Sequence, residues 1–296
     1  MGFMRMTCLC LCAGMMILFG GTAAARGHRE ITKGRVTVAP FPKAPTMDGR
    51  IEEGEWDAAA SVIGFQSIVP RGSLWFHRLE ARWGRTWIGY TNEALYIAVA
   101  TEIAPDGSLI QRYRDRDFHM NFDDQIEVWI DPSRGAREAD ESADRTYYHF
   151  MGNSLGAISD LRHIPSKGAP DLGWNGNWTF ENHIDEEAGV WSLELSIPFT
   201  DFGWKAGTAE GRAIGLLIAR NWFRPGMQTT AFSHLGAFAD TGLFPLVQLT
   251  RDAPSVHVKS LGKGGFDKYF AAEVGLELEI RNPGPARQAR VNLMIE

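Results

Sequence analysis

The stretch "VWSLELSIP" (190–198) decides the fold class of this chain. Its positions alternate: from Trp191 to Ile197 every second residue is large and apolar, and the residues between are serine or glutamate. Successive side chains of a β-strand point to opposite faces, so this period of two predicts a strand with one face in a core. Pro198 then ends the strand, because proline cannot donate to a central ladder.

The same alternation recurs along most of the chain. It predicts strands at 94–103 ("ALYIAVATEI") and 125–131 ("QIEVWID"), and the continuous apolar run at 215–220 is typical of a central strand covered on both sides. Turn signals rich in Gly, Asn, Asp and Pro separate these runs, and the best helical turn is "EEGEWDAAA" at 52–60. Strands at this spacing without crossover helices predict an all-β fold, an antiparallel β-sandwich of jelly-roll type.

Residues 1–25 have the features of a secretory signal peptide. The single charge is Arg5, an apolar stretch follows, and "TAAAR" offers an Ala-x-Ala cleavage site before Arg26. All three cysteines lie in this segment, so the exported chain would have no disulfide and no thiolate ligand. We therefore expect a secreted, periplasmic or cell-surface protein, with no membrane partner after cleavage.

The rest of the chain divides near residue 251. We expect residues 26–250 to form the sandwich and residues 251–296 to hold a linker and the first strands of a second β-sandwich. Two strands cannot bury a face alone, so this end either continues into a longer protein or packs on the first domain.

Charge gives no sign of a polyanionic partner. The net charge of −6 becomes −7 once Arg5 leaves with the signal peptide, and there is no basic stripe. Nucleic acid is therefore not an expected partner.

Seven segments, taken in order, resemble the family 9 carbohydrate-binding modules, part of a wider group of DOMON-like β-sandwiches. The resemblance covers residues 45–249. The segments are "MDGRIEEGEWDAAA" (47–60), "WIGYTNEALYIAVATE" (87–102), "FDDQIEVWIDPS" (122–133), "YYHFMGNSLGAI" (147–158), "WSLELSIPFTDFG" (191–203), "IGLLIARNW" (214–222) and "FADTGLFPLVQL" (238–249). In the first segment we expect Trp56 to be structural, a lid on the end of the sandwich above a short helix.

The resemblance implies a sugar clamped between two aromatic rings, with polar groups on strands binding its hydroxyls. The first clamp position falls near Asn121, with Phe118 and Phe122 close by, and the second at Phe238. The acidic pair of the family motif is present as Asp124 and Glu127.

Two further residues complete the candidate carbohydrate site. His149 stands where the family has an arginine, and Trp174 lies in a glycine-rich loop, a common position for a ligand-contacting aromatic. The face of Glu127, which also carries Trp129, is either a sugar platform or an outer face covered by the next strand.

Metal and haem are secondary possibilities. Asp115, Asp117 and Asp123 are weak candidates for a structural calcium, although their spacing is not that of an EF-hand. Some DOMON-like relatives bind haem, and the residues that could serve as ligands here are Met120, Met151, Met227, His119, His149 and His163.

No motif marks a catalytic site. The sequence has no phosphate loop and no His-Glu-x-x-His motif. We expect a non-catalytic carbohydrate-binding module, accessory to polysaccharide degradation by a glycoside hydrolase or surface protein. The alternatives are a haem-binding redox domain and a structural sandwich whose sugar site has decayed.

Overall fold

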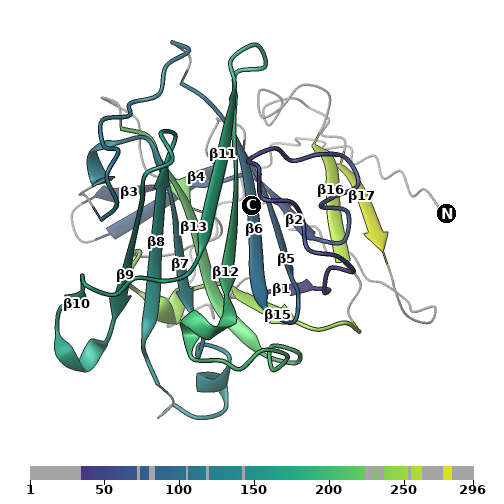
Figure 1. Cartoon of the computed structure of the whole chain (residues 1–296), viewed down its shortest axis with the longest axis vertical. Helices are drawn as coiled ribbons and strands as arrows, with labels where there is room; N and C mark the ends of the chain where they lie inside the picture. The colour runs from purple at the N-terminus through teal and green to yellow at the C-terminus, as the bar shows by residue number, and fades with distance from the viewer. Residues whose placement is uncertain are drawn as a thin grey trace, which may run out of the picture.

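The computed structural model describes residues 35–71, 74–79, 84–104, 106–117, 120–141, 144–223, 230–231, 237–252, 255–261 and 276–281. In this part of the chain the fold is two stacked β-sheets and a two-stranded hairpin, connected by turns and 3-10 helices, with no α-helix (Figure 1). The predicted all-β sandwich is confirmed. No helix within the described ranges is long and apolar enough to cross a membrane.

The larger sheet has the order β10-β9-β8-β7-β13-β14-β3-β4, and β13 also pairs with β15, which pairs in parallel with β1. Its strands are β1 (Arg35–Val38), β3 (Gln66–Arg71), β4 (Leu74–Leu79), β7 (Gln125–Asp131), β8 (Tyr147–Asn153), β9 (Ile158–His163), β10 (Pro170–Asp171), β13 (Ala213–Asn221), β14 (Thr230–Ala231) and β15 (Leu246–Leu249).

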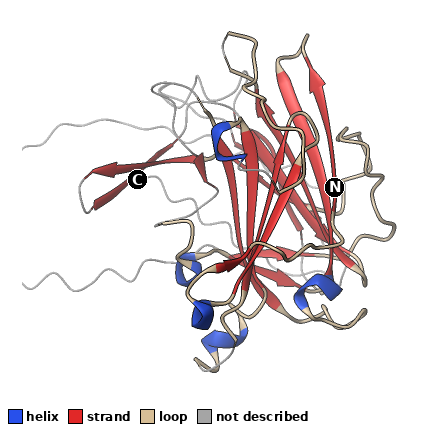
Figure 2. Cartoon of the chain, turned by 60° about the vertical axis from the view of Figure 1, so that its left-hand side comes forward, coloured by secondary structure: helices blue, strands red, loops and turns tan. Residues whose placement is uncertain are grey.

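The smaller sheet is antiparallel throughout, in the order β11-β12-β6-β5-β2. Its strands are β2 (Ala60–Ile63), β5 (Gly84–Tyr90), β6 (Ala94–Glu102), β11 (Thr179–Asp185) and β12 (Val190–Pro198). The 3-10 helices are η1 (Met120–Phe122), η2 (Ala136–Glu138), η3 (Pro165–Lys167), η4 (Phe199–Phe202) and η5 (Thr241–Leu243), most of them at one end of the strands in Figure 2.

The core lies between the sheets and is built from the predicted alternating faces. The apolar residues of β12, from Trp191 to Ile197, are at most 1% exposed, and they face the apolar side chains of β7 and β13. β13 is buried on both sides, as the continuous apolar run predicts. The alternating pattern therefore fixes which side chains of each strand point out of the sandwich.

The N-terminal segment Phe41–Ala59 covers the outer face of the smaller sheet, and we call it the clasp. Trp56 is 2% exposed and lies with Phe41 on the outer face of β6, not on the end of the sandwich as expected. Residues 53–58 form turns, so the expected helix at 52–60 is wrong. The chain here is held by a carboxylate beneath it, because Glu194 of β12 accepts hydrogen bonds from the backbone of Asp48 and Gly49 and from the Trp56 indole.

At the C-terminal end, β16 (Ser255–Leu261) and β17 (Leu276–Arg281) form a separate antiparallel hairpin beside β2. Figure 2 shows this hairpin extending from the side of the sandwich. The domain boundaries at residues 25 and 250 remain predictions.

Candidate functional site

The candidate site lies on the outer face of the larger sheet, where β7 is central. Gln125, Glu127, Trp129 and Asp131 of β7 point away from the sandwich core, on the side opposite to Ile126 and its apolar neighbours. Register places Trp129 beside His149 of β8 and places Gln125 beside Asn221 of β13. Side chains from three strands therefore meet around Glu127.

Four nitrogen atoms surround the Glu127 carboxylate, whose residue is 6% exposed. Gln125 Nε2 donates to Oε1 at 3.1 Å, Trp129 Nε1 donates to Oε2 at 2.8 Å, and Asn221 Nδ2 donates to Oε1. His149 Nε2 completes the shell at 2.8 Å from Oε2. Burial on its own raises the pKa of Glu127, but His149 and the donated hydrogen bonds outweigh it and lower the pKa, so Glu127 is ionised.

This shell leaves acceptors without partners. A carboxylate only accepts hydrogen bonds, so both amide groups must turn their NH₂ toward Glu127 and their oxygens away from it. Gln125 Oε1 and Asn221 Oδ1 are buried and have no hydrogen-bond partner among the described residues, and the same holds for His149 Nδ1. An unpaired buried polar atom is costly, and a ligand that donates hydrogen bonds would remove that cost.

Aromatic rings extend the site along the same face. Trp129 is stacked on His149, with ring centroids 3.7 Å apart, and Tyr147 is stacked on His163 at 4.4 Å. Trp129 also lies within 5.4 Å of the His163 ring and 6.3 Å of the Phe238 ring. We call the set Trp129, Tyr147, His149, His163 and Phe238 the aromatic row.

The rings of the aromatic row differ in exposure. Trp129 and His149 are buried, whereas Tyr147, His163 and Phe238 are half-buried and reach the surface. Burial, with a smaller contribution from His149, lowers the pKa of His163 to about 4, so this ring is neutral near pH 7. The accessible edge of the site is thus uncharged and aromatic.

Three of the predicted sugar-site residues come together here. Glu127, His149 and Phe238 lie in the shell or the aromatic row. Glu127 is enclosed by donors, so it orients the surrounding groups rather than offering free lone pairs. Glu127 and the two rings that contact it, Trp129 and His149, are buried, and the rings that reach the surface on this face are Tyr147, His163 and Phe238.

Asp124 and Asn121 lie elsewhere. Asp124 is 0% exposed, and its oxygens accept the backbone N–H groups of Ile110 and Phe223 at 2.9 and 2.7 Å. It joins two loops to the start of β7, so the expectation of a sugar-contacting acid at this position is not supported by the geometry. Asn121 is in η1, and its side chain lies outside the described residues.

Trp174 lies on the other side of the larger sheet. Its ring packs against Tyr148 and Phe150, at centroid distances of 5.0 and 5.9 Å, and both of these side chains belong to the sandwich core. His149, between them in β8, points the opposite way. Trp174 is therefore separated from the Glu127 shell by the sheet, and we leave it out of the site.

The calcium candidates do not gather. Asp123 is buried and accepts from the backbone of Arg112 and Tyr113 and from Asn153 Nδ2, while Asp115 and Asp117 are exposed. Across the described ranges, no three His, Cys, Asp or Glu side chains are placed to hold a metal ion.

For haem, the methionine candidates Met120 and Met151 share a buried apolar cluster with Ala157. The candidates His119 and Met227 lie outside the described residues.

Sequence reasoning missed the roles of Gln125 and Asn221, and of Tyr147 and His163 in the aromatic row. Gln125 was placed on the correct face by the period of two. Asn221 is 94 positions from Glu127, and only the pairing of β7 with β13 brings them together. The one signal available was that a polar amide residue begins β7, Gln125, and another ends β13, Asn221.

Comparisons with known proteins agree on the fold. Two matching structures are family 9 carbohydrate-binding modules from Caldicellulosiruptor kristjanssonii, one in complex with cellotriose and one with glucose. Each is 13% identical to this chain with a TM-score of 0.52; the matches cover 74% of this chain and 95% and 97% of theirs.

A Bacteroides uniformis structure described as a carbohydrate-binding protein matches with a TM-score of 0.55, at 13% identity over 74% of this chain and all of its own. No family model matches the sequence, and no curated protein matches it. The chain has the β-sandwich fold of the family 9 carbohydrate-binding modules.

Proposed function

We propose that this protein is a non-catalytic carbohydrate-binding module whose site is the Glu127 shell with the aromatic row. The observation that carries the proposal is the set of unpaired acceptors, Gln125 Oε1 and Asn221 Oδ1, held in place by one buried carboxylate. Hydroxyl groups donate to such acceptors, and the C–H face of a sugar ring packs on an aromatic ring. Saccharides combine both properties in one molecule.

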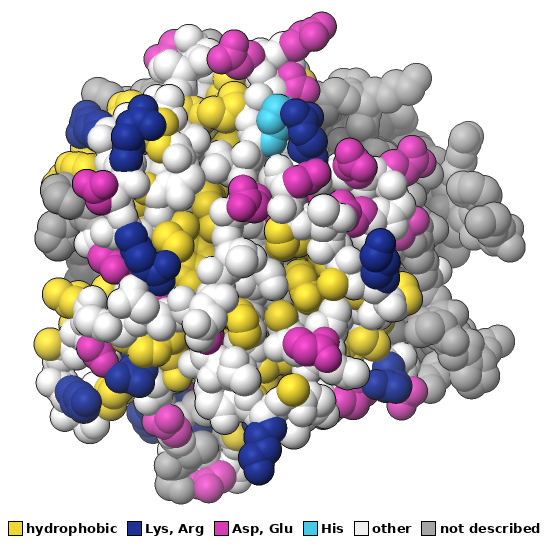
Figure 3. All heavy atoms as spheres, in the orientation of Figure 1, with side chains coloured by type: hydrophobic (Ala, Val, Ile, Leu, Met, Phe, Trp, Pro, Cys, Tyr) yellow, Lys and Arg dark blue, Asp and Glu magenta, His cyan; other side chains and the backbone are white. Residues whose placement is uncertain are grey.

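The surface fits a neutral ligand better than a polyanion. The accessible rings of the site, Tyr147, Phe238 and the neutral His163, carry no charge. On the opposite face of the molecule, which Figure 3 draws, basic and acidic side chains are intermingled and no basic stripe runs across it. The fold likeness to modules solved with cellotriose and glucose supports the same ligand class. We take the ligand to be a mono- or oligosaccharide, or the end of a polysaccharide.

The decisive experiment compares two half-buried aromatic residues on opposite faces of the larger sheet. Phe238→Ala removes a ring of the aromatic row, and Trp174→Ala removes a ring that packs on the core side. A glycan array identifies the ligand, and calorimetry then measures its affinity for wild type and both variants. Because a stacked ring contributes about 1 kcal/mol beyond its burial, Phe238→Ala should weaken binding roughly fivefold while Trp174→Ala leaves it unchanged.

Three results would contradict the proposal. Wild type binding no glycan at millimolar concentration would favour a structural sandwich with a decayed site. Equal losses in both variants would place the ligand elsewhere. A Soret band in the purified protein would favour the haem-binding alternative.

We further infer that the module is exported and serves polysaccharide degradation. Support for export comes from the apolar N-terminal segment and the Ala-x-Ala site before Arg26. N-terminal sequencing of the protein recovered outside the cytoplasm should begin at Arg26, and recovery of the uncleaved chain would contradict it. Association with a glycoside hydrolase predicts that the module increases hydrolase activity on an insoluble polysaccharide, and no increase would count against that role.

A further inference from the structure

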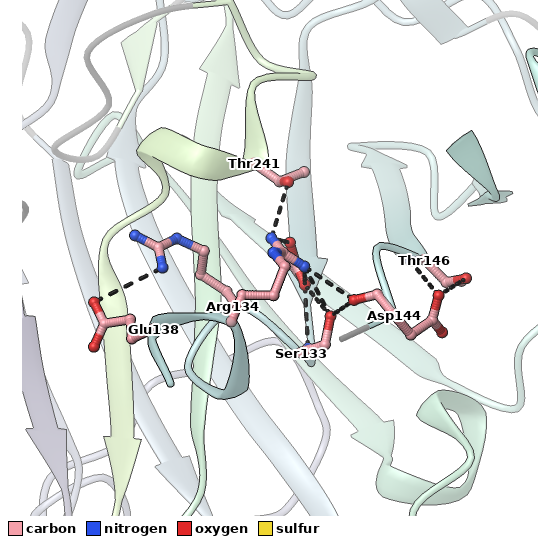
Figure 4. A network of polar contacts seen from close by, with 8 residues as sticks. Ser133, Arg134, Glu138, Asp144, Thr146 and Thr241 are labelled. Atoms are coloured by element: carbon pink, nitrogen blue, oxygen red, sulfur yellow. Dashed lines mark hydrogen bonds and ion pairs between the residues drawn. The ribbon is translucent and has the colours of Figure 1, made fainter. Parts of the chain in front are cut away.

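A second polar cluster adjoins the aromatic row at the end of β7, and it is centred on Arg137 of η2. Arg137 Nη1 donates to Asp131 Oδ1 at 3.0 Å, to Ser133 Oγ at 2.8 Å and to the Asp144 carbonyl at 3.1 Å. Arg137 Nη2 donates to Asp131 Oδ2 and, at 3.3 Å, to Thr241 Oγ1. In Figure 4, Ser133 and Thr241 approach the cluster from different segments of the chain, whereas the side chain of Asp144 points toward Thr146 and only its backbone carbonyl belongs to the cluster.

These contacts join the segments that carry two rings of the aromatic row, Tyr147 and Phe238. Asp144 precedes Tyr147, the first residue of β8, and Thr241 follows Phe238 by three positions in a series of tight turns. Asp131 is 0% exposed and follows Trp129 on the same face of β7. One guanidinium group thus ties Tyr147, Trp129 and Phe238 to a common frame.

Arginine suits this position because of its shape. Its planar fork donates to several acceptors in fixed directions, and the side chain of the buried Asp131 opposite gives it a bidentate partner. A lysine would supply the same charge as a single ammonium group and would not reach all four partner residues at once. The frame therefore depends on geometry more than on net charge.

We propose that Arg137 is a positioning residue that sets the place of Phe238 and Tyr147 against Trp129 and thereby determines ligand affinity. The second half of this inference rests on the proposed carbohydrate function. Arg137 acts through Thr241 and the backbone of Asp144.

The test uses two threonines in the same network. Thr241→Val removes the hydroxyl that accepts a hydrogen bond from Arg137 Nη2 in the segment of Phe238. Thr146→Val removes the hydrogen bond from Thr146 Oγ1 to Asp144 Oδ1, in which Arg137 takes no part. Protein labelled with 5-fluorotryptophan reports on Trp129, whose ¹⁹F resonance is assigned by its absence in Trp129→Phe. Ring currents from Phe238 act on this resonance, so it registers movement of the Phe238 ring.

Thr241→Val and Arg137→Lys should both shift or broaden the Trp129 resonance and weaken glycan binding about three- to tenfold. Thr146→Val should do neither. An unchanged Trp129 resonance in Arg137→Lys and Thr241→Val would overturn the positioning role, whether or not any glycan binds. A shifted resonance with unchanged affinity would overturn the link to binding, and a wild type that binds no glycan would instead overturn the proposed function.

Discussion

The two sheets each carry a buried glutamate on the outer face, and the two glutamates have different partners. Glu127 on the larger sheet and Glu194 on the smaller sheet both accept an indole N–H at 2.8 Å, from Trp129 and Trp56 respectively. The remaining donors to Glu194 are backbone N–H groups of the clasp. The remaining partners of Glu127 are side chains of neighbouring strands.

The type of donor decides what each carboxylate can do. A backbone N–H group that donates to Glu194 has no second polar atom left for a ligand. This contact therefore only holds the clasp on the sheet. An amide side chain that donates to Glu127 keeps its oxygen, and the buried oxygens of Gln125 and Asn221 have no partner among the described residues, so this site holds unused acceptors. The pKa directions agree with this difference: burial outweighs the hydrogen bonds and raises the pKa of Glu194, whereas the pKa of Glu127 is lowered. The same residue type thus anchors the chain in one place and orients a binding surface in the other.

The largest effect should come from the clasp at Gly49. Its φ is +82°, and a Cβ there would lie 2.4 Å from the backbone carbonyl carbon of Asn182. Gly49→Ala should therefore lower the free energy of unfolding by about 4 kcal/mol, from left-handed strain and the backbone clash together. Urea unfolding measures it as a lower midpoint at unchanged slope.

Gly54→Ala is the matched control for this change. Gly54 has a φ of +88° in the same clasp, but a Cβ there meets nothing within 4 Å. The cost should be only about 1 kcal/mol of backbone strain. Equal costs at the two glycines would show that the close packing of the clasp on β11 does not stabilise the fold.

Glu194→Gln should have the next largest effect. The new NH₂ group has no lone pair for the clasp donors, so about 2 kcal/mol of stability should be lost, with glycan affinity unchanged. Glu181→Gln provides the comparison, because Glu181 pairs with Glu194 in register and is exposed. A loss of affinity in Glu194→Gln would contradict the separation of the two faces.

Glu127→Gln, in contrast, should weaken glycan binding. Its NH₂ would face the amide groups of Gln125 and Asn221, which would turn, and their oxygens would no longer be held as free acceptors. Affinity should fall about tenfold, or about 1.4 kcal/mol. Calorimetry of Glu127→Gln beside Glu194→Gln measures the contrast, and unchanged affinity in Glu127→Gln would remove this carboxylate from the site.

The alternating patterns predicted the faces because burial is a local property of a strand. They placed Glu127 and Trp129 together on the outside of the sandwich and Ile126 inside. They could not identify Asn221 as a partner of Glu127, because that contact depends on the register between β7 and β13. They also misplaced Trp174, since whether a loop aromatic packs on the core or on the outer face depends on how the loop folds back.

The clasp shows the same limit of sequence-based prediction, because a distant contact overrides its local helix preference. Its acids and Trp56 predicted a helical turn and a structural role, and only the structural role is confirmed. Glu194 lies 138 positions from Trp56 and accepts hydrogen bonds that a helix would not supply. A local propensity of a few tenths of a kcal/mol is outweighed by a charge-assisted contact of this kind.

The smallest predicted effect is a pH dependence on the larger sheet. The pKa of His163 is about 4 in the folded protein against 6.5 as the reference value, so the unfolded chain binds the proton more readily. Stability should therefore fall as the pH drops from 6.5 to about 4, and His163 should contribute no further loss below that. Because the ring is half-exposed and solvent screens it, we expect a loss of about 1 kcal/mol.

His163→Gln isolates this contribution. Glu127 loses its own stabilisation in acid, because its folded pKa is lowered, but that loss is common to wild type and variant. The difference between their unfolding free energies should therefore change across pH 6.5 to 4 in proportion to His163 alone. His183→Gln, at a half-buried histidine on the smaller sheet, is the comparison. Parallel pH profiles of unfolding free energy for wild type and His163→Gln would mean that the His163 ring accepts a proton as readily in the folded protein as in the unfolded chain. The assignment of an uncharged edge to the site would then be wrong.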